Sequence, residues 1–513
     1  MAGLFIRPFR VFNPFPSPIR IMESASGSSQ GFPNVAPSAY QLPAHLTAPD
    51  DDLFRSDGNR SPTNKEHPHV NTEPEVKMIC ELGSPGDDED RRSGANTTTN
   101  MQTLMHLLKG NIGTGVLAMA SAFKNSGLAT GAIAIMVMGV ICIHCMHILV
   151  NCSHFLSKKE AKSAMDYGEV IEASVRNSRF RTKARAAKLT VDVFIIVSQF
   201  GFCCVYIVYV ATTLHDVIAS YAKVEIPITA YVAMVLPFLI LLSFIRSLKI
   251  LAPFSMVANA VLCVCLGIIF VYVFQHLEPS TSLPQFGGWD RLPLFFGTAI
   301  YAFEGIGIIL PIENRMKNPH DFGGWTGVLN LAMVCIAALY CAAGFFGYLA
   351  FGEDIKGSIT LNLPAEPIYI AVKLLVAAVI FYSYSLQFYV PFEILWPTVK
   401  RKLRTETRIK YGEYLFRTGL VIFTFALAAA IPKLDLFISL VGAVGSSFLA
   451  LVFPPLLEVS TFGMEGMGRL NWKLWKNAFI FLFGLVGFVL GTYVAIQEIV
   501  LSFQADAAAN HHN

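Results

Sequence analysis

The sequence predicts an all-α polytopic membrane protein. Three observations carry this prediction: 54% of the 513 residues are hydrophobic, only 15% are charged, and the mean hydropathy is +0.51. Soluble domains contain about 25% charged residues. The net charge is only +3, and no basic run is interleaved with aromatic residues, so the sequence does not favour nucleic-acid binding.

The first 96 residues differ from the rest of the chain. They hold 12 of the 27 prolines and an acidic run at residues 87–90. Because such a segment cannot bury enough apolar surface to fold, we expect a disordered cytoplasmic tail over residues 1–96. Residues 1–22 are basic and aromatic, but they lack the continuous apolar core, about 7–15 residues long, of a secretory signal peptide.

The membrane domain is expected over residues 97–502, followed by a short luminal or extracellular tail at 503–513. A spanning helix needs about 20 apolar residues. Eleven runs meet this requirement, at residues 101–123, 128–155, 189–217, 227–245, 250–275, 291–313, 325–349, 367–397, 413–431, 434–456 and 475–502.

The connecting loops indicate the orientation. With eleven spans, the five most basic connections, 156–188, 246–249, 314–324, 398–412 and 457–474, all lie on one side of the membrane. By the positive-inside rule that side is cytoplasmic. We therefore expect a cytoplasmic amino terminus and a luminal or extracellular carboxy terminus.

The first span is too rich in glycine for an uninterrupted helix. Gly110, Gly113 and Gly115 fall within six residues, with Asn111 and Thr114 between them. Each glycine in a helix interior costs about 1 kcal/mol relative to alanine. A break in this helix would leave backbone N–H and C=O groups that hydrocarbon cannot satisfy, so we expect the break to line a cavity or contact a ligand.

The sixth span has a matching feature. Glu304 lies near the middle of this span and is followed by Gly305 and Gly307. An ionisable residue at the membrane centre costs from about 2.5 kcal/mol upward, so a functional role is the default interpretation. The alternative is a protonated carboxyl group hydrogen-bonded to a neighbouring helix, which is itself compatible with transport.

The two Gly-x-Gly motifs, at 113–115 and 305–307, lie 192 residues apart and open spans one to five and six to ten. A five-helix unit crosses the membrane an odd number of times, so its second copy is inverted. Paired interrupted spans at corresponding positions point to the midplane site of a secondary transporter; the alternative is that each motif only allows close helix packing. We predict an inverted repeat of residues 101–275 and 291–456, with 475–502 as an extra helix.

The stretch 107–115, Leu-Leu-Lys-Gly-Asn-Ile-Gly-Thr-Gly, resembles the first-helix motif of the amino acid/auxin permease family. The preceding His106 makes the proton-coupled amino acid transporter branch the most similar one. Residues 303–307 and 310–314 resemble the sixth helix of that branch, although the family often has proline where Ala120 stands. The resemblance implies an inverted five-plus-five (LeuT-like) fold with discontinuous helices 1 and 6, in which spans 1, 2, 6 and 7 move against spans 3, 4, 8 and 9.

The motifs and the resemblance together predict an amino acid bound between the two breaks. Its carboxylate would accept hydrogen bonds from N–H groups at the start of a half-helix, where partial positive charge lies, and its ammonium would meet freed carbonyl groups. Glycines leave room for the backbone to approach but form no large side-chain pocket, which favours small neutral amino acids such as alanine, glycine or proline. The predicted substrate-binding residues are Asn111, Gly113, Thr114, Gly115, Phe303, Glu304, Gly305 and Gly307.

Two titratable residues are predicted to couple transport to protons. The histidine that matches His106 serves proton coupling in the resembling branch, and histidine is the side chain that changes charge nearest physiological pH. The alternative role for His106 is helix packing through a hydrogen bond. Glu304 is the second candidate. We therefore expect proton symport by alternating access, with protons as the coupling ion and without a cofactor, a metal site or enzymatic activity.

Other polar residues are candidates for lining the path. Ser255 and Asn259 are four residues apart and share a face of span five. Span eight carries a polar stripe that serves either the path or hydrogen bonding between helices: Tyr382, Ser383, Tyr384, Ser385, Gln387 and Tyr389.

The same sequence is compatible with a second function. An amino-acid sensor would bind the substrate and signal to partner proteins through the cytoplasmic tail, and the sequence does not separate this function from transport. The plasma membrane and the lysosomal or endosomal membrane both agree with the predicted orientation.

Overall fold

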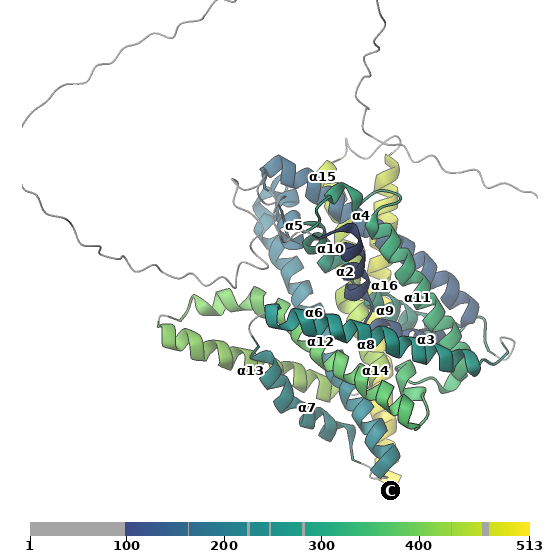
Figure 1. Cartoon of the computed structure of the whole chain (residues 1–513). Coiled ribbons are helices and arrows are strands. Elements are labelled where there is room, and N and C mark those ends of the chain that lie inside the picture. The colour runs from purple at the N-terminus through teal and green to yellow at the C-terminus, as the bar shows by residue number, and fades with distance from the viewer. Residues whose placement is uncertain are drawn as a thin grey trace, which may run out of the picture. The chain divides into compact units, whose positions relative to one another are not determined.

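The computed structural model describes residues 98–162, 164–222, 226–245, 248–279, 283–403, 405–431, 433–463 and 471–512, and the predicted tail lies outside them. The described part is built from helices (Figure 1). The longer ones are α2 (Asn100–Asn111), α3 (Thr114–Ser126), α4 (Leu128–Glu160), α5 (Tyr167–Arg176), α6 (Ala184–Ala222), α7 (Ile228–Ser243), α8 (Leu248–Gln275), α9 (Leu292–Ala302), α10 (Ile306–Glu313), α11 (Val328–Phe351), α12 (Pro367–Lys400), α13 (Glu406–Ala430), α14 (Leu434–Val441), α15 (Phe453–Phe462) and α16 (Trp472–His512).

Nine segments among the described residues are long and apolar enough to cross a membrane. They are α4, α6, most of α8, the α9–α10 pair, α11, α12, α13, the segment from α14 to α15, and α16. The apolar helix α7 is shorter, with 16 residues. Helices α2 and α3 have 12 and 13 residues because the first span is interrupted. The described part is therefore a multi-pass membrane domain.

Both predicted helix breaks are present. Helix α2 ends at Asn111 and α3 begins at Thr114, while α9 ends at Ala302 and α10 begins at Ile306. The prediction of discontinuous first and sixth spans is thus confirmed. Helix α3 continues through Ala120, the position where the family often has proline.

Two helix boundaries differ from the predictions. Helix α16 continues to His512, beyond the span predicted at about residues 475–502, through an alanine-rich segment with high helix propensity. The basic connection 156–188 is not an irregular loop: it contains α5, which the sequence analysis missed. The side chain of Asp166 accepts a hydrogen bond from the Glu169 backbone N–H at 2.7 Å and caps this helix.

The membrane helices pack in two groups. In the first group α11 packs along α3 and α4, and α3 packs along α9. In the second group α6 packs along α12, α7 and α13. These are the spans that the family resemblance assigns to a moving bundle and to a scaffold. The segments just before α2 and just after α10 are tied together, since the Thr98 backbone N–H donates to the Arg315 carbonyl oxygen at 2.8 Å.

The tenth span departs from a regular α-helix. Between α14 and α15 the chain forms two π-helical segments, η6 (Gly442–Ser446) and η7 (Phe448–Val452). Glycine allows η6 to approach α6 closely: a methyl group at Gly445 would lie 3.1 Å from the Cα and Cβ atoms of Ser198. Single π-helical turns inside α-helices are frequent at functional sites. The segment η6 faces the break in the sixth span, since its Ser446 contacts Glu304.

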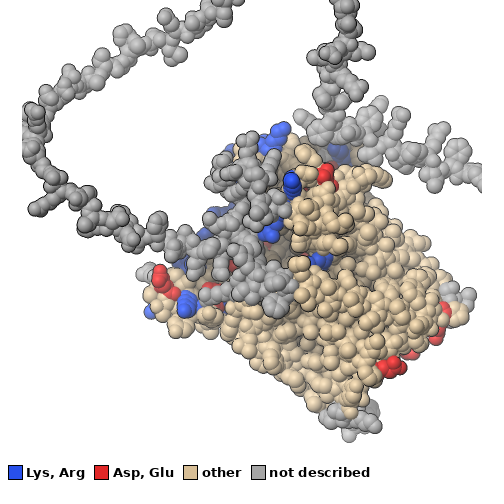
Figure 2. Space-filling view, in the orientation of Figure 1, with Lys and Arg blue, Asp and Glu red and all other residues tan. Residues whose placement is uncertain are grey.

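Charge on the surface is uneven. Figure 2 shows a broad face without charged side chains, with Lys and Arg gathered toward the end of the molecule near α15 and α5 in Figure 1. Large apolar side chains are exposed along the helices, among them Ile133, Val140, Leu241 and Phe479. An uncharged band with exposed apolar side chains is the surface expected where lipid surrounds a protein.

Candidate functional site

The break in the first span leaves backbone donors without a side-chain cap. Gly113 occupies the N-cap position of α3, and no side chain caps this end of the helix. The first N–H groups of a helix have no partner within the helix, and the helix dipole adds partial positive charge there. A methyl group at Gly113 would lie 3.9 Å from the Tyr206 hydroxyl, its nearest neighbour, so the backbone is approachable here.

Glu304, at the break in the sixth span, directs its carboxylate toward other helices. The Oε2 atom of Glu304 accepts a hydrogen bond from Ser198 Oγ of α6 at 2.9 Å and another from Ser446 Oγ of η6. Neither donor is charged, so these two hydrogen bonds give the half-buried Glu304 carboxyl group no cationic partner. Such a group is either protonated or energetically costly, which makes it a candidate for holding a proton.

One tyrosine connects the two breaks. The hydroxyl oxygen of Tyr340, on α11, lies 2.6 Å from the Asn111 carbonyl oxygen and 2.8 Å from the Ala302 carbonyl oxygen. Its single proton can be donated to only one of them at a time. The Thr114 and Tyr301 side-chain hydroxyls form a second link, at 2.8 Å. Tyr340 therefore bridges the ends of α2 and α9, and the second link joins the start of α3 to α9.

Two of the predicted glycines lie where the interrupted spans meet. A methyl group at Gly115 would lie 2.8 Å from both the Cα and the Cβ atom of Ala302. A methyl group at Gly305 would collide with the Asn111 side chain, 2.7 Å from its Nδ2 atom. Gly307 is different, since it is exposed and has nothing within 4 Å of such a group. Close approach thus explains Gly115 and Gly305 but not Gly307.

A cavity of about 430 Å³ lies beside these breaks. Helices α6, α8 and α12 contribute uncharged polar side chains to its lining, namely Gln199, Tyr206, Asn259, Ser383 and Gln387. The lining also has basic residues, namely His106 and Lys109 of α2 and Arg315 just after α10, and we call this part the basic end of the cavity. Among the described residues, no Asp or Glu belongs to this lining.

The predicted site residues separate into two sets around the cavity. His106, Gly113, Thr114 and Asn259 line it, and His106 is exposed at its basic end. The others, at the breaks but outside the lining, are Asn111, Gly115, Phe303, Glu304, Gly305 and Gly307. The backbone of Ser255 belongs to α8, but its side chain lies outside the part that the structure describes.

Two further lining residues, Gln199 and Tyr206, are not among the predicted site residues. These two residues lie seven apart on α6, a spacing that places them on one helix face, and this polar pair was the available signal. The polar residues of span eight fall into two kinds: some line the cavity, and others form hydrogen bonds between helices. Gln387 Nε2 lies 3.3 Å from the Tyr206 hydroxyl beside the cavity, whereas the Tyr384 hydroxyl bonds Thr424 of α13 at 2.9 Å.

Comparison with known proteins now gives the family. A family model described as transmembrane amino acid transporter protein matches residues 96–497. The chain belongs to this family. It is 37% identical over 434 residues to the Drosophila melanogaster protein called proton-coupled amino acid transporter-like protein pathetic, covering 83% of this chain and 91% of that one. It is also 29% identical over 427 residues to the probable amino acid transporter skat-1 of Caenorhabditis elegans, covering 80% and 92% of the two chains.

A solved structure shares the fold of this family member. The inward-facing conformation of Mhp1 superimposes with a TM-score of 0.51 and 12% sequence identity, covering 81% of this chain and 92% of the Mhp1 chain. At this identity the similarity concerns the fold alone. The family assignment indicates a transporter and not an enzyme.

Proposed function

We propose that the chain is a secondary active transporter that moves small neutral amino acids by proton symport and alternating access. The cavity lined by the first helix break and by α6, α8, α10 and α12 is the observation that carries this proposal. Backbone donors at the start of α3 suit a substrate carboxylate. The Oε1 atom of Gln199, a residue of the cavity lining, has no hydrogen-bond partner among the described residues, and such an acceptor suits a substrate ammonium group.

The charge of the lining supports neutral substrates. A cationic substrate side chain would find no carboxylate in the described lining, and it would meet His106, Lys109 and Arg315 at the basic end. Glycine at position 113, in the cavity lining, leaves the protein backbone open to the carboxylate and ammonium groups that all amino acids share. The names of the relatives, one of them called proton-coupled amino acid transporter-like, support protons as the coupling ion.

The proposed topology has eleven spans, with the α2–α3 pair and α7 added to the nine long segments. Spans one to five and six to ten form the inverted repeat, and α16 is the additional helix. The basic end of the cavity then opens to the cytoplasm on the side of the amino terminus, in agreement with the distribution of Lys and Arg in Figure 2. We place the protein in the plasma membrane or a lysosomal or endosomal membrane, which imaging of a tagged chain would distinguish.

Uptake by the purified full-length chain in proteoliposomes tests the function. Labelled alanine, glycine and proline are expected to accumulate when the outside is more acidic than the inside, and to accumulate less without the proton gradient. Lysine is expected to be a poor substrate. Amino-acid binding without pH-driven uptake would contradict the transporter and favour the sensor.

The coupling residues are tested in the same assay. His106→Ala and Glu304→Gln are each expected to lower acid-stimulated uptake about tenfold or more, the factor that corresponds to about 1.4 kcal/mol. His276→Ala and Glu366→Gln change an exposed histidine and an exposed glutamate outside the cavity lining, and serve as matched controls with unchanged uptake. Full acid stimulation in either test variant would remove that residue from the coupling mechanism.

A further inference from the structure

The side of the membrane domain opposite the basic end of the cavity is covered by the connection between α11 and α12. We call residues 352–366 the outer loop; it contains the short turns η4 (Gly352–Asp354) and η5 (Ile359–Asn362). Many of its side chains are almost completely buried, including Ile355, Ser358, Ile359, Thr360 and Leu361. Most loops run over the surface of a protein, so this one is unusual in being packed between helix ends.

Glu353 and Ile359 attach the outer loop to the helices that contain or contact the break in span one. The Nζ atom of Lys124, on α3, donates to the Glu353 carbonyl oxygen at 2.6 Å. The Tyr348 hydroxyl, on α11, donates to Glu353 Oε1 at 2.6 Å. A methyl group at Gly347 would lie 2.8 Å from Ile359 Cδ1 and equally close to the Ala120 methyl of α3. The outer loop must therefore follow α3 and α11 when they move.

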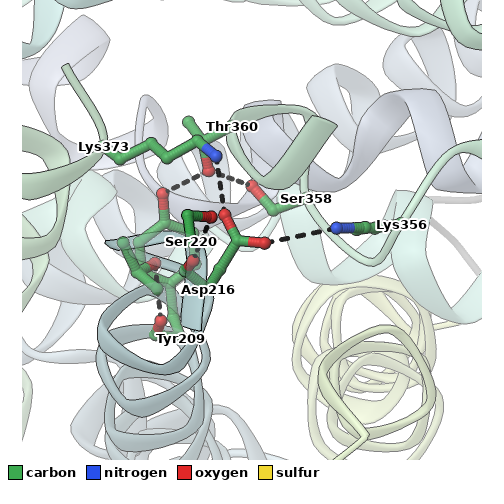
Figure 3. Close-up of polar contacts among 8 residues, drawn as sticks. Tyr209, Asp216, Ser220, Lys356, Ser358, Thr360 and Lys373 are labelled. Carbon is green, nitrogen blue, oxygen red and sulfur yellow. Dashed lines mark hydrogen bonds and ion pairs between the residues drawn. The ribbon is translucent and has the colours of Figure 1, made fainter. Parts of the chain in front are cut away.

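Lys356 and Thr360 attach the outer loop to α6, which belongs to the other group of helices (Figure 3). The Lys356 Nζ atom lies 3.3 Å from Asp216 Oδ1. The Tyr209 hydroxyl lies 2.7 Å from Thr360 Oγ1, which is also 2.9 Å from Ser358 Oγ. Asp216 and Tyr209 both project from α6, seven residues apart and so on one helix face. These contacts join the two helix groups on the side away from the cavity opening.

A buried lysine orients the aspartate. The Nζ atom of Lys373, on α12, lies 2.6 Å from Asp216 Oδ2, and the Lys373 side chain is only 4% exposed. Asp216 thereby presents its other oxygen, Oδ1, to Lys356, whose side chain is 55% exposed. Breaking a buried pair leaves an uncompensated charge and is costly, whereas an exposed pair contributes little. The contacts that can break during a transport cycle are the Lys356–Asp216 ion pair and the Tyr209–Thr360 hydrogen bond. The Lys373–Asp216 ion pair stays formed.

We propose that Asp216 and Tyr209 of α6, together with Lys356 and Thr360 of the outer loop, form a latch that keeps the outer side of the transport path closed. Lys373 is a positioning residue that acts through Asp216. The proposal rests on the proposed alternating-access function. In the outward-open state the outer loop leaves α6 together with α3 and α11, while the Lys373–Asp216 pair stays intact within the scaffold.

Labelling of a cysteine inside the cavity tests the latch. Val379 lines the cavity on α12 and is buried, so Val379→Cys in the full-length protein reports opening toward a membrane-impermeant thiol reagent added from the outer side. Adding Lys356→Met and Thr360→Val is expected to raise the labelling rate roughly threefold to fiftyfold, the range for losing one exposed ion pair and one buried hydrogen bond. The matched control, Lys356→Arg with Thr360→Ser, keeps both contacts and is expected to label like the parent.

A second variant separates the latch from general damage to the fold. Asp216→Asn with Lys373→Met removes both buried charges, so the protein is expected to fold, yet Lys356 has lost its partner and labelling is expected to be fast. Unchanged labelling in folded samples of both test variants would overturn the latch. Labelling requires no substrate, so a chain that fails to take up amino acids but shows these rates would contradict the proposed substrate and leave the latch standing.

Discussion

Gly115→Val is expected to abolish most uptake, because the valine side chain would enter the space occupied by the Ala302 backbone. A methyl group at this position already lies 2.8 Å from Ala302 Cα, and backbone atoms cannot rotate out of the way as the end of a flexible side chain can. Overpacking of a well-packed interior costs about 1–3 kcal/mol and occasionally more. The strain falls between α3 and α9, so we expect uptake in proteoliposomes to fall about tenfold or more.

The control for this prediction is another glycine in a membrane helix. Gly419 of α13 is exposed, and a methyl group there would have nothing within 4 Å. Gly419→Val is therefore expected to leave uptake near the wild-type rate. If both variants transport normally, close packing of the two interrupted spans is not required for transport. If both fail equally, the loss reflects valine in a membrane helix and not the position of Gly115.

Lys373→Met is expected to cause the largest loss of stability. It leaves the Asp216 carboxylate, which is 19% exposed, with only the exposed Lys356 as its partner. Removing one partner of a buried ion pair costs about 3–5 kcal/mol, and we expect the lower end of this range because Asp216 keeps one ion pair and some exposure. The measurement is the thermal unfolding midpoint of the purified protein in detergent.

Removing the partner charge distinguishes an electrostatic effect from lost packing. Adding Asp216→Asn to Lys373→Met eliminates the unpaired carboxylate, and replacing a whole buried pair by neutral side chains is often close to neutral for stability. The double variant is therefore expected to regain most of the lost unfolding midpoint. A double variant as unstable as Lys373→Met alone would show that Lys373 stabilises the protein through packing.

The helix breaks were predictable because their signal is local. Three glycines within six residues, or a mid-span glutamate followed by Gly-x-Gly, disfavour a continuous helix whatever surrounds them. The bilayer adds a strict condition, since unpaired backbone groups in hydrocarbon need a partner. These two facts were enough to predict both breaks and a cavity or ligand beside them, and to select residues such as Gly113 and Thr114 that line the cavity.

The partners of these residues were not predictable. Tyr340 bridges two carbonyl oxygens from a position 229 residues after Asn111, and nothing in its own neighbourhood in the sequence distinguishes it. Ser446 reaches Glu304 from a π-helical segment that has no evident sequence signal apart from its glycines. Asp216 and Lys373 are 157 residues apart, in two apolar helices. In the sequence each is an isolated charge, and nothing near either residue indicates that the two form a pair.

By itself the sequence determined the class of protein, most of the spans and the places where two of them are interrupted, because hydrophobic length and glycine content act within about 20 residues along the chain. The tertiary structure alone decided which side chains meet at the breaks, that Glu304 bonds two serines, and that Asp216 joins the outer loop to a buried lysine. The physical reason is that hydrogen bonds and ion pairs depend on distances of about 3 Å, and only the packing of helices distant in sequence brings those atoms together.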